Sequence, residues 1–286
     1  MVFSSIFDQL HHDKKRLAHN PLIMGILNIT PDSFYDGGSY TQETLWLKRA
    51  EQIIEEGGKI IDIGAFSTRP GAKNVTEDEE WNRLSPVLKS IKNNFPETTI
   101  SVDTWRASIA GHAINEGADI INDISGGTMD ANMFGIIEKN QIPYILMHIQ
   151  GTPQDMQADP NYRDVTEEVK QYFIEKSTQL EDRGFSKIIL DPGFGFGKSV
   201  NHNYKLLNNL ADFKPLGYPL LVGISRKSMI NKVLNIKPLE ALNGTTVLNT
   251  IALINGADIL RVHDVKQAAE TAKIIHALVE TSAMEI

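Results

Sequence analysis

Short, uninterrupted apolar runs recur along the chain, and seven of eight end directly at a polar or charged residue. The remaining run, residues 60–63, carries Asp62 within it. Continuous rather than alternating hydrophobicity is typical of parallel strands that are covered on both faces. The pattern therefore predicts eight buried strands, at residues 22–27, 60–63, 99–102, 119–121, 144–147, 187–190, 220–224 and 258–260.

Amphipathic stretches between these runs predict helices at residues 41–56, 76–93, 106–116, 131–139, 165–183, 204–210, 239–254 and 265–279. Three helices end at Gly57, Gly117 and Gly256, each expected to adopt the left-handed conformation that stops a helix. Thr76 and Thr166 are the expected helix starts, and only Thr76 has the glutamate three residues later that a capping box requires.

Eight strand–helix units predict an α/β fold, a (β/α)8 TIM barrel that forms a single domain over residues 21–286. Residues 1–20 have apolar positions at roughly helical spacing and predict a short N-terminal helical extension. Active sites of such barrels lie at the C-terminal ends of the strands, so the polar residues there are the candidate site.

The composition of the chain excludes several kinds of site and argues against several classes of function. The chain has no cysteine, which excludes disulfides, thiolate metal sites and a thiol nucleophile. Its net charge of −8 argues against nucleic-acid binding, because no basic stripe can neutralise phosphates. No apolar run is long enough to span a membrane, and the N-terminus lacks the features of a signal peptide. We therefore expect a cytoplasmic protein that binds small molecules.

Several cations lie near strand ends in this acidic chain: Arg69, Lys227, Arg261 and His263. An arginine there could pair with a neighbouring carboxylate. Several around one mouth favour an anionic ligand, since the planar guanidinium binds phosphate oxygens in a bidentate manner. Asn28 offers a hard oxygen that could join substrate phosphates on Mg²⁺.

Asp103, Asn122 and Asp191 form a second set at the ends of three predicted strands. Carboxylates accept hydrogen bonds and an amide both donates and accepts, so this set suits a nitrogen heterocycle that carries NH and NH₂ groups. The alternative is an internal hydrogen-bond network. Asp62 and Asp123 could have structural roles, holding strand ends or loop amides.

Two glycine-containing segments imitate known motifs. Residues 193–199 resemble a phosphate loop, but Pro192 stands where its first glycine is required. The glycines instead predict a tight loop over a ligand, with Phe194 or Phe196 presenting its ring. Residues 223–227 lack the last glycine of a nucleophile elbow, which argues against serine-hydrolase chemistry.

Taken together, ordered motifs in this chain resemble the dihydropteroate synthase family. The resemblance is carried by residues 24–34, 67–72, 101–104, 121–127, 147–153, 191–198, 225–228 and 261–265. It implies a homodimeric barrel that condenses 6-hydroxymethyl-7,8-dihydropterin diphosphate with p-aminobenzoate, giving 7,8-dihydropteroate and diphosphate with the help of Mg²⁺.

The resemblance also implies roles for individual residues. The pterin is expected to contact Asp103, Asn122, Met147, Asp191, Lys227 and Arg261. The diphosphate is expected at Asn28, Arg69, Arg261 and His263, with Asn28 also on the metal, and p-aminobenzoate at Thr68, Pro70, Phe196, Lys227 and Ser228. Asp103, Lys227 and Arg261 are the expected catalytic residues, in a dissociative displacement that needs no strong base.

One departure from the family pattern is Phe66, where a glutamate or another polar residue is expected. Two other functions stay open from the sequence. A methyltetrahydrofolate-dependent methyltransferase would share the pterin-binding residues but would not need the anion site of Arg69, Arg261 and His263. A non-catalytic pterin-binding barrel would be expected to have lost Asn28, Arg69 or Lys227, and all three are present.

Overall fold

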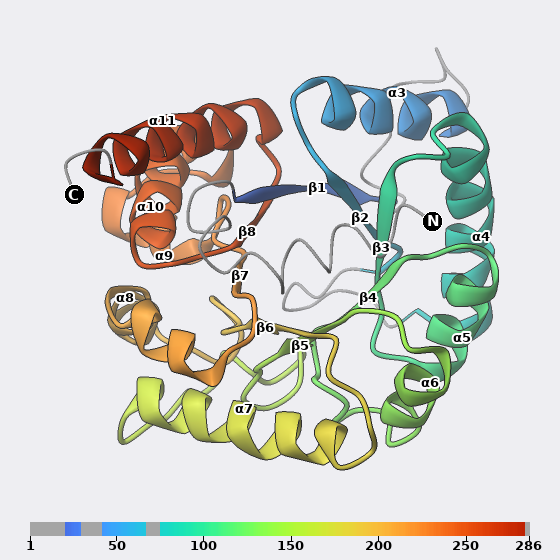
Figure 1. Ribbon diagram of the computed structural model, residues 1–286, viewed down its shortest axis with the longest axis horizontal. Helices are drawn as coiled ribbons and strands as arrows, with labels where there is room; N and C mark the ends of the chain where they lie inside the picture. Colours follow the sequence, from blue (N-terminus) through green and yellow to red (C-terminus); the bar gives the residue numbers. More distant parts are fainter. Residues whose placement is uncertain (1–20, 30–41, 67–74, 284–286) are drawn as a thin grey trace.

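The computed structural model describes residues 21–29, 42–66 and 75–283. Its strands are all parallel and form one sheet in the order β6-β5-β4-β3-β2-β1-β8-β7. A bridge between Leu190 and Leu220 joins β6 to the start of β7, so the sheet curls into a barrel (Figure 1). The strands are β1 (Leu22–Asn28), β2 (Ile60–Gly64), β3 (Thr99–Asp103), β4 (Ile120–Asp123), β5 (Tyr144–Met147), β6 (Ile188–Asp191), β7 (Leu221–Val222) and β8 (Ile259–Val262). The predicted (β/α)8 barrel is confirmed.

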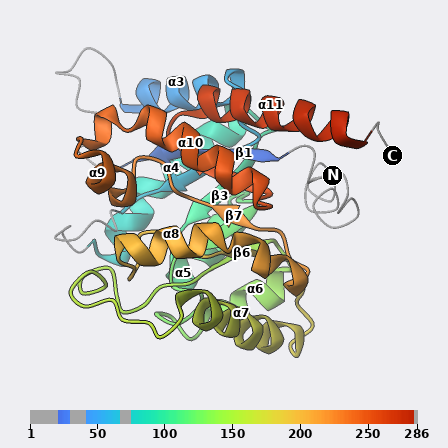
Figure 2. The same cartoon turned by 90° about the vertical axis from the view of Figure 1, so that its left-hand side faces the viewer.

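Helices surround the strands in Figures 1 and 2 and cover their outer faces. They are α3 (Gln42–Glu55), α4 (Glu77–Asn94), α5 (Ala107–Asn115), α6 (Met133–Asn140), α7 (Val165–Glu181), α8 (Val200–Asn208), α9 (Ser228–Leu234), α10 (Leu242–Ile254) and α11 (Val265–Ala283), with 3-10 turns η2 (Leu210–Leu216) and η3 (Pro238–Glu240). No helix in the described part of the chain is long and apolar enough to cross a membrane. The predicted N-terminal extension, residues 1–20, lies outside the described residues.

Helix ends follow the local chemistry of the sequence. Gly57, Gly117 and Gly256 have φ of +100°, +96° and +96°, which confirms the predicted left-handed turns. The Thr76 hydroxyl accepts a hydrogen bond from the amide of Glu79, as the predicted cap requires.

Two helix predictions were wrong in detail, and one helix was missed. α8 starts at Val200 rather than at residue 204, because Ser199 and His202 form a capping box. Asp164, not Thr166, caps α7, since its carboxylate accepts from the amides of Thr166 and Glu167. The helix α9 was not predicted at all.

Two apolar layers hold the barrel. The larger fills the space between strands and helices. The smaller lies inside the barrel and is built from Met24, Ile60, Ile120, Ile145, Ile189, Leu221 and Ile259. Side chains alternate along a strand, so the next interior position lies two residues further on. There the interior turns polar, since Asp62, Asn122, Asp191 and Arg261 follow the isoleucines of β2, β4, β6 and β8.

Candidate active site

A buried ion cluster occupies the polar end of the barrel. Arg261 of β8 donates through Nε to Asp62 Oδ2 at 2.7 Å and through Nη2 to Asp103 Oδ2 at 2.9 Å. Asp62 is fully buried, and both other side chains are mostly enclosed. Arg261 therefore pairs with carboxylates, as one reading of the sequence allowed, while it remains beside the residues expected to bind a ligand.

Burial sets the protonation of this cluster. Loss of hydration raises the pKa of Asp103 to about 7, with the nearby charge of Arg261 acting in the opposite direction. Desolvation lowers the pKa of Arg261, but the charges of Asp62 and Asp103 outweigh it and the net shift is upward. Arg261 is consequently a permanent cation, whereas Asp103 can change its charge near neutral pH.

The buried acceptor atoms that have no partner among the described residues include Oδ1 of Asp103 and Oδ1 of Asn122, both at the polar end of the barrel. These residues lie side by side on paired strands β3 and β4. Asn122 is oriented by its Nδ2, which donates to Asp62 Oδ2 at 3.2 Å. Buried acceptors without partners are rare in folded proteins, so this pair is suited to N–H donors from a ligand.

Asp191 and Lys227 form the opposite side of the site. Asp191 Oδ1 accepts the Gly193 amide at 2.8 Å, and burial raises the pKa of this carboxyl. Lys227 donates to the carbonyl of Phe194, and its ammonium lies 4.7 Å from the centre of the Phe196 ring. Burial lowers the pKa of Lys227 to about 8. Two further candidates are adjacent in the fold, because Met147 pairs with Asp191 and Ser228 begins the helix that Lys227 caps.

Asn28 and His263 extend the site towards β1 and β8. A methyl group on Gly64 would lie 3.5 Å from Asn28 Oδ1 and 3.7 Å from Asp103 Oδ2, so both side chains face this glycine. Burial, together with the charge of Arg261, lowers the pKa of His263 to about 4 and keeps it neutral at physiological pH. Three other sequence candidates, Thr68, Arg69 and Pro70, lie outside the described residues.

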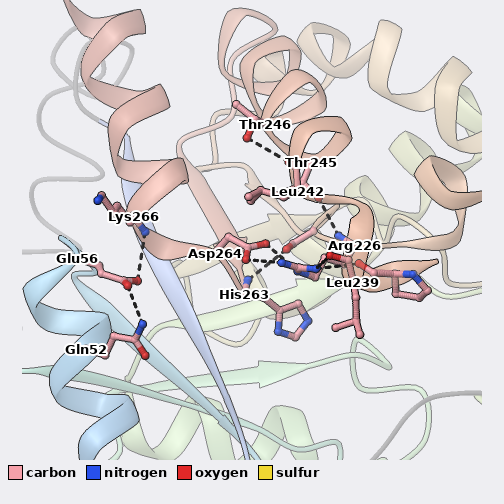
Figure 3. A network of polar contacts seen from close by, with 12 residues as sticks. Gln52, Glu56, Arg226, Leu239, Leu242, Thr245, Thr246, His263, Asp264 and Lys266 are labelled. Carbon is pink, nitrogen blue, oxygen red and sulfur yellow. Dashed lines mark hydrogen bonds and ion pairs between the residues drawn. The ribbon is translucent and has the colours of Figure 1, made fainter. Parts of the chain in front are cut away.

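The ends of β7 and β8 are joined by an ion pair that sequence reasoning missed (Figure 3). Arg226 donates to both carboxylate oxygens of Asp264, at 2.9 and 2.7 Å, and to the carbonyls of Pro238 and Leu239. Its φ is +57°, a left-handed conformation that is uncommon for a residue with a side chain. The ion pair fixes the distance between the two strand ends. Lys227 follows Arg226 and His263 precedes Asp264, so the pair also positions these two site residues.

Gly223 was also missed as a site residue. A methyl group there would lie 3.8 Å from Cβ of Arg261 and 3.9 Å from Nζ of Lys227. The glycine therefore keeps open the space between two cations. In the sequence, Gly223 was considered only as part of a possible nucleophile elbow, and that pattern does not indicate this role.

Asp123 has the structural role that the sequence allowed for. Its carboxylate accepts from the amides of Ser125 and Gly127, at 2.7 and 2.8 Å, and from the hydroxyl of Tyr144 at 2.7 Å. It shapes the loop after β4, and each of its two carboxylate oxygens already accepts two hydrogen bonds. Asp62, in contrast, belongs to the ion cluster.

Within the described residues, no group of three His, Asp or Glu side chains could hold a metal ion by itself. Asn28 Oδ1 is a hard donor beside the Asp103 carboxylate. Such a sparse donor set fits Mg²⁺, which keeps several waters and is commonly completed by substrate phosphates. It does not fit a zinc site, which needs three or four protein ligands.

Comparison with known proteins identifies the family. Residues 24–263 match the pterin binding enzyme family. The dihydropteroate synthase of Escherichia coli (strain K12) is 46% identical over 263 residues, covering 91% of this chain and 92% of the relative. The chain belongs to the dihydropteroate synthase family. It is thus a transferase of folate biosynthesis.

Solved structures agree with this assignment. Dihydropteroate synthase of Yersinia pestis, in a sulfonamide drug complex, superposes with a TM-score of 0.86 and 40% identity, over 92% of this chain and 96% of that one. The Xanthomonas albilineans dihydropteroate synthase with 4-aminobenzoic acid gives a TM-score of 0.85 and 35% identity, over 92% and 94%. The barrel of a dihydropteroate synthase is thus present across nearly the whole chain.

Proposed function

We propose that this protein condenses 6-hydroxymethyl-7,8-dihydropterin diphosphate with p-aminobenzoate, releasing diphosphate and 7,8-dihydropteroate. The observation that carries the proposal is the pair of unpartnered buried acceptors, Asp103 Oδ1 and Asn122 Oδ1, next to the buried cation of Arg261. A pterin edge presents the N–H donors that these oxygens lack. Family membership supplies the reaction class.

The pterin lies across the polar end of the barrel in this proposal. Asp103, Asn122 and Asp191 accept hydrogen bonds from its ring nitrogens and amino group, and the guanidinium of Arg261 lies against its face. Lys227 donates to its carbonyl side, and Met147 supplies an apolar wall. Burial of Asp103 supports this arrangement, because a carboxyl that has lost its hydration gains from a ligand that returns hydrogen bonds.

The arylamine half of the site lies at Phe196, Lys227 and Ser228, together with Thr68 and Pro70. The Phe196 ring beneath the Lys227 ammonium offers both an apolar surface and a cation for the carboxylate of p-aminobenzoate. The Xanthomonas albilineans relative holds 4-aminobenzoic acid. A methyltransferase would not need an arylamine site of this kind beside the pterin.

The diphosphate is held by Asn28, Arg69, Arg261 and His263. Neutral His263 binds it as a hydrogen-bond donor rather than as a charge. Asn28 would hold Mg²⁺, which would supply positive charge to the leaving diphosphate. As the C–O bond breaks, negative charge grows on the diphosphate, so Arg261 stabilises the transition state more than the ground state.

Asp103 has a second task in this reaction. Cleavage of the C–O bond leaves positive charge on the pterin methylene, and an ionised Asp103 beside the ring stabilises it. The neutral amine of p-aminobenzoate then attacks the methylene carbon, and the proton that it loses passes to solvent or released diphosphate. Asp103, Lys227 and Arg261 are therefore the proposed catalytic residues.

Diphosphate release tests the proposal directly. Purified protein receives dihydropterin diphosphate and Mg²⁺, with and without p-aminobenzoate, and the products are separated by chromatography. We expect diphosphate and dihydropteroate in equal amounts, only when both substrates are present. Pterin binding without turnover would favour the non-catalytic alternative, and activity with a methyl donor would favour the methyltransferase.

We also propose that the protein is a homodimer that associates through α10 and α11, which pack side by side (Figure 2). Val247, Ile251 and Ile254 line one exposed stripe of α10, while Ile274 and Leu278 form another on α11, with Ile274 70% exposed. Neighbouring exposed apolar stripes on two packed helices suit association with a second copy of the chain. Sedimentation should give a dimer for the native chain and a monomer for Ile251→Glu; a native monomer would refute this proposal.

A further inference from the structure

A second lysine, Lys198, lies beneath the loop that carries Phe194 and Phe196. Its side chain is almost completely buried. The Nζ atom is 3.1 Å from the Gly193 carbonyl, 3.1 Å from the Phe196 carbonyl and 2.9 Å from Nδ1 of His148. Buried lysines are rare unless they are paired, and this one has no carboxylate in direct contact among the described residues.

The contacts of Lys198 suit its protonated, ammonium form. An ammonium group has three N–H donors, and three acceptors surround it within 3.1 Å. His148 must then be neutral with an unprotonated Nδ1, which agrees with its lowered pKa in the buried interior. Burial lowers the pKa of Lys198 to about 7, while Asp191 acts to raise it and Lys227 to lower it.

Side chains hold every carbonyl of the loop from Gly193 to Gly197. Lys198 binds the carbonyls of Gly193 and Phe196 from the interior, and Lys227 binds that of Phe194 from the site. Gln157 and Tyr162 donate to the remaining two, those of Gly195 and Gly197.

The loop backbone allows no side chain at two of its glycines. Gly193 and Gly197 both have positive φ, and a methyl group on them would lie 1.9 Å from the His148 carbonyl and 2.4 Å from the Gln150 carbonyl. The loop therefore rests directly on the segment that follows β5. Lys198 joins these two segments, because it contacts both His148 and the loop.

We propose that Lys198 is a positioning residue for the arylamine half of the site, acting through the loop that presents Phe196 and supports Lys227. This inference rests on the proposed function. Among the described residues, Lys198 contacts His148 and the loop, and it makes no direct contact with the pterin residue Asp191, which it reaches through Gly193. Its effect is therefore expected to fall mainly on p-aminobenzoate.

The test compares Lys198→Met with Lys92→Met. Lys92 also holds a backbone carbonyl, that of Thr98, and pairs with Asp119, but it lies at the opposite end of the barrel. For Lys198→Met we expect the KM for p-aminobenzoate to rise about tenfold or more, with less than about a threefold change in the KM for the pterin diphosphate. Lys92→Met should lose stability without this split.

A second pair of variants covers the case in which Lys198→Met fails to fold. His148→Asn keeps an acceptor for the Lys198 ammonium, whereas His148→Leu removes it, and both lose the ring contact with Tyr172. We expect His148→Leu to raise the KM for p-aminobenzoate more than His148→Asn does. Equal KM values for this pair, or equal rises for both substrates in Lys198→Met, would overturn the proposal.

Calorimetric binding of p-aminobenzoate, in the presence of a pterin and diphosphate, needs no turnover. If the native chain binds it but produces no dihydropteroate, the proposed function fails while the loss of binding in Lys198→Met still supports the positioning role. If the native chain and Lys198→Met bind it equally well, the positioning role fails.

Discussion

Asp62 and Arg261 form a buried ion pair across the barrel interior, with Nη2 2.6 Å from Oδ2. Asp62 has no exposed surface, so its charge exists only in the company of Arg261 and Asn122. Removing one partner of such a pair leaves the other charge buried without compensation. Asp62 thereby supports two residues expected to contact the pterin without facing the ligand itself.

Replacing Asp62 with asparagine should therefore weaken both stability and catalysis. We expect the free energy of unfolding to fall by about 3 kcal/mol, measured by urea denaturation, because the Arg261 cation loses its closest counter-charge. Asp103→Asn is the matched control, since Arg261 then keeps Asp62 and the loss of stability should be smaller. Equal losses would show that the two carboxylates contribute alike.

Pterin binding should depend on pH through Asp103, whose pKa is raised to about 7. The ionised carboxylate is the better acceptor, so affinity should increase as pH rises from about 6 to about 8, and Asp103→Asn should lose this increase. His263 stays neutral throughout this range and cannot produce it, while Lys227, whose pKa is about 8, loses its proton as pH rises and acts in the opposite direction. Calorimetric titration of a pterin at several pH values measures the effect.

The same shift has a consequence for stability with a fixed sign. Folded Asp103 holds its proton more strongly than the unfolded chain does, where the pKa is near 3.8. Its contribution therefore favours the folded state most below pH 3.8 and declines as pH rises through about 7. Denaturation of Asp103→Asn should show a flatter pH dependence across this range than the native chain.

The Arg226–Asp264 pair should couple the two strand ends energetically. A double-mutant cycle with Arg226→Met and Asp264→Asn is expected to give a coupling energy of about 1–3 kcal/mol in unfolding experiments. Arg226→Lys should recover little activity, because an ammonium cannot reproduce the bidentate contact. A coupling energy near zero would mean that the carbonyls of Pro238 and Leu239 suffice to hold Arg226.

Two glycine substitutions should distinguish a position where a neighbouring backbone atom leaves no room for a side chain from one where glycine only adds backbone freedom. Gly193→Ala places a methyl group 1.9 Å from a backbone carbonyl and is expected to cost about 3 kcal/mol or more of unfolding free energy. Gly135→Ala, in α6 with open space around it, should stabilise the protein by about 0.5–1 kcal/mol. Thermal unfolding of both variants provides the comparison.

Gly223→Ala should affect binding rather than folding. The added methyl group makes ordinary contacts with Arg261 and Lys227, so the free energy of unfolding should change by less than about 0.5 kcal/mol. It nevertheless occupies space between these cations, and we expect weaker pterin binding by calorimetry. Unchanged affinity would place the ligand away from Gly223.

Much of the fold was predictable, because buried parallel strands leave continuous apolar runs and glycines mark the ends of several helices. The strand-end residues followed from the same pattern: Asp103, Asn122, Asp191 and Arg261 all lie at the C-terminal end of the barrel. Their proximity follows from topology alone, since parallel strands in a barrel point their ends to one face.

Other features depend on contacts between distant segments, and no local pattern reports those. Lys198 meets His148 across 50 residues of sequence, and Arg226 meets Asp264 across 38. The start of α8 was wrong because a histidine, rather than a glutamate, completes the cap of Ser199. The helix α9 has only seven residues, which leaves little helical periodicity from which to predict it.

The loop from Gly193 to Gly197 combines a composition expected of a flexible linker with a backbone whose carbonyls all have donors. A glycine-rich segment loses more conformational entropy on ordering than any other sequence of its length. In this protein that entropy is lost when the chain folds, before a ligand binds. An arylamine that binds against Phe196 meets a surface already fixed, so its affinity is not reduced by the ordering of a loop.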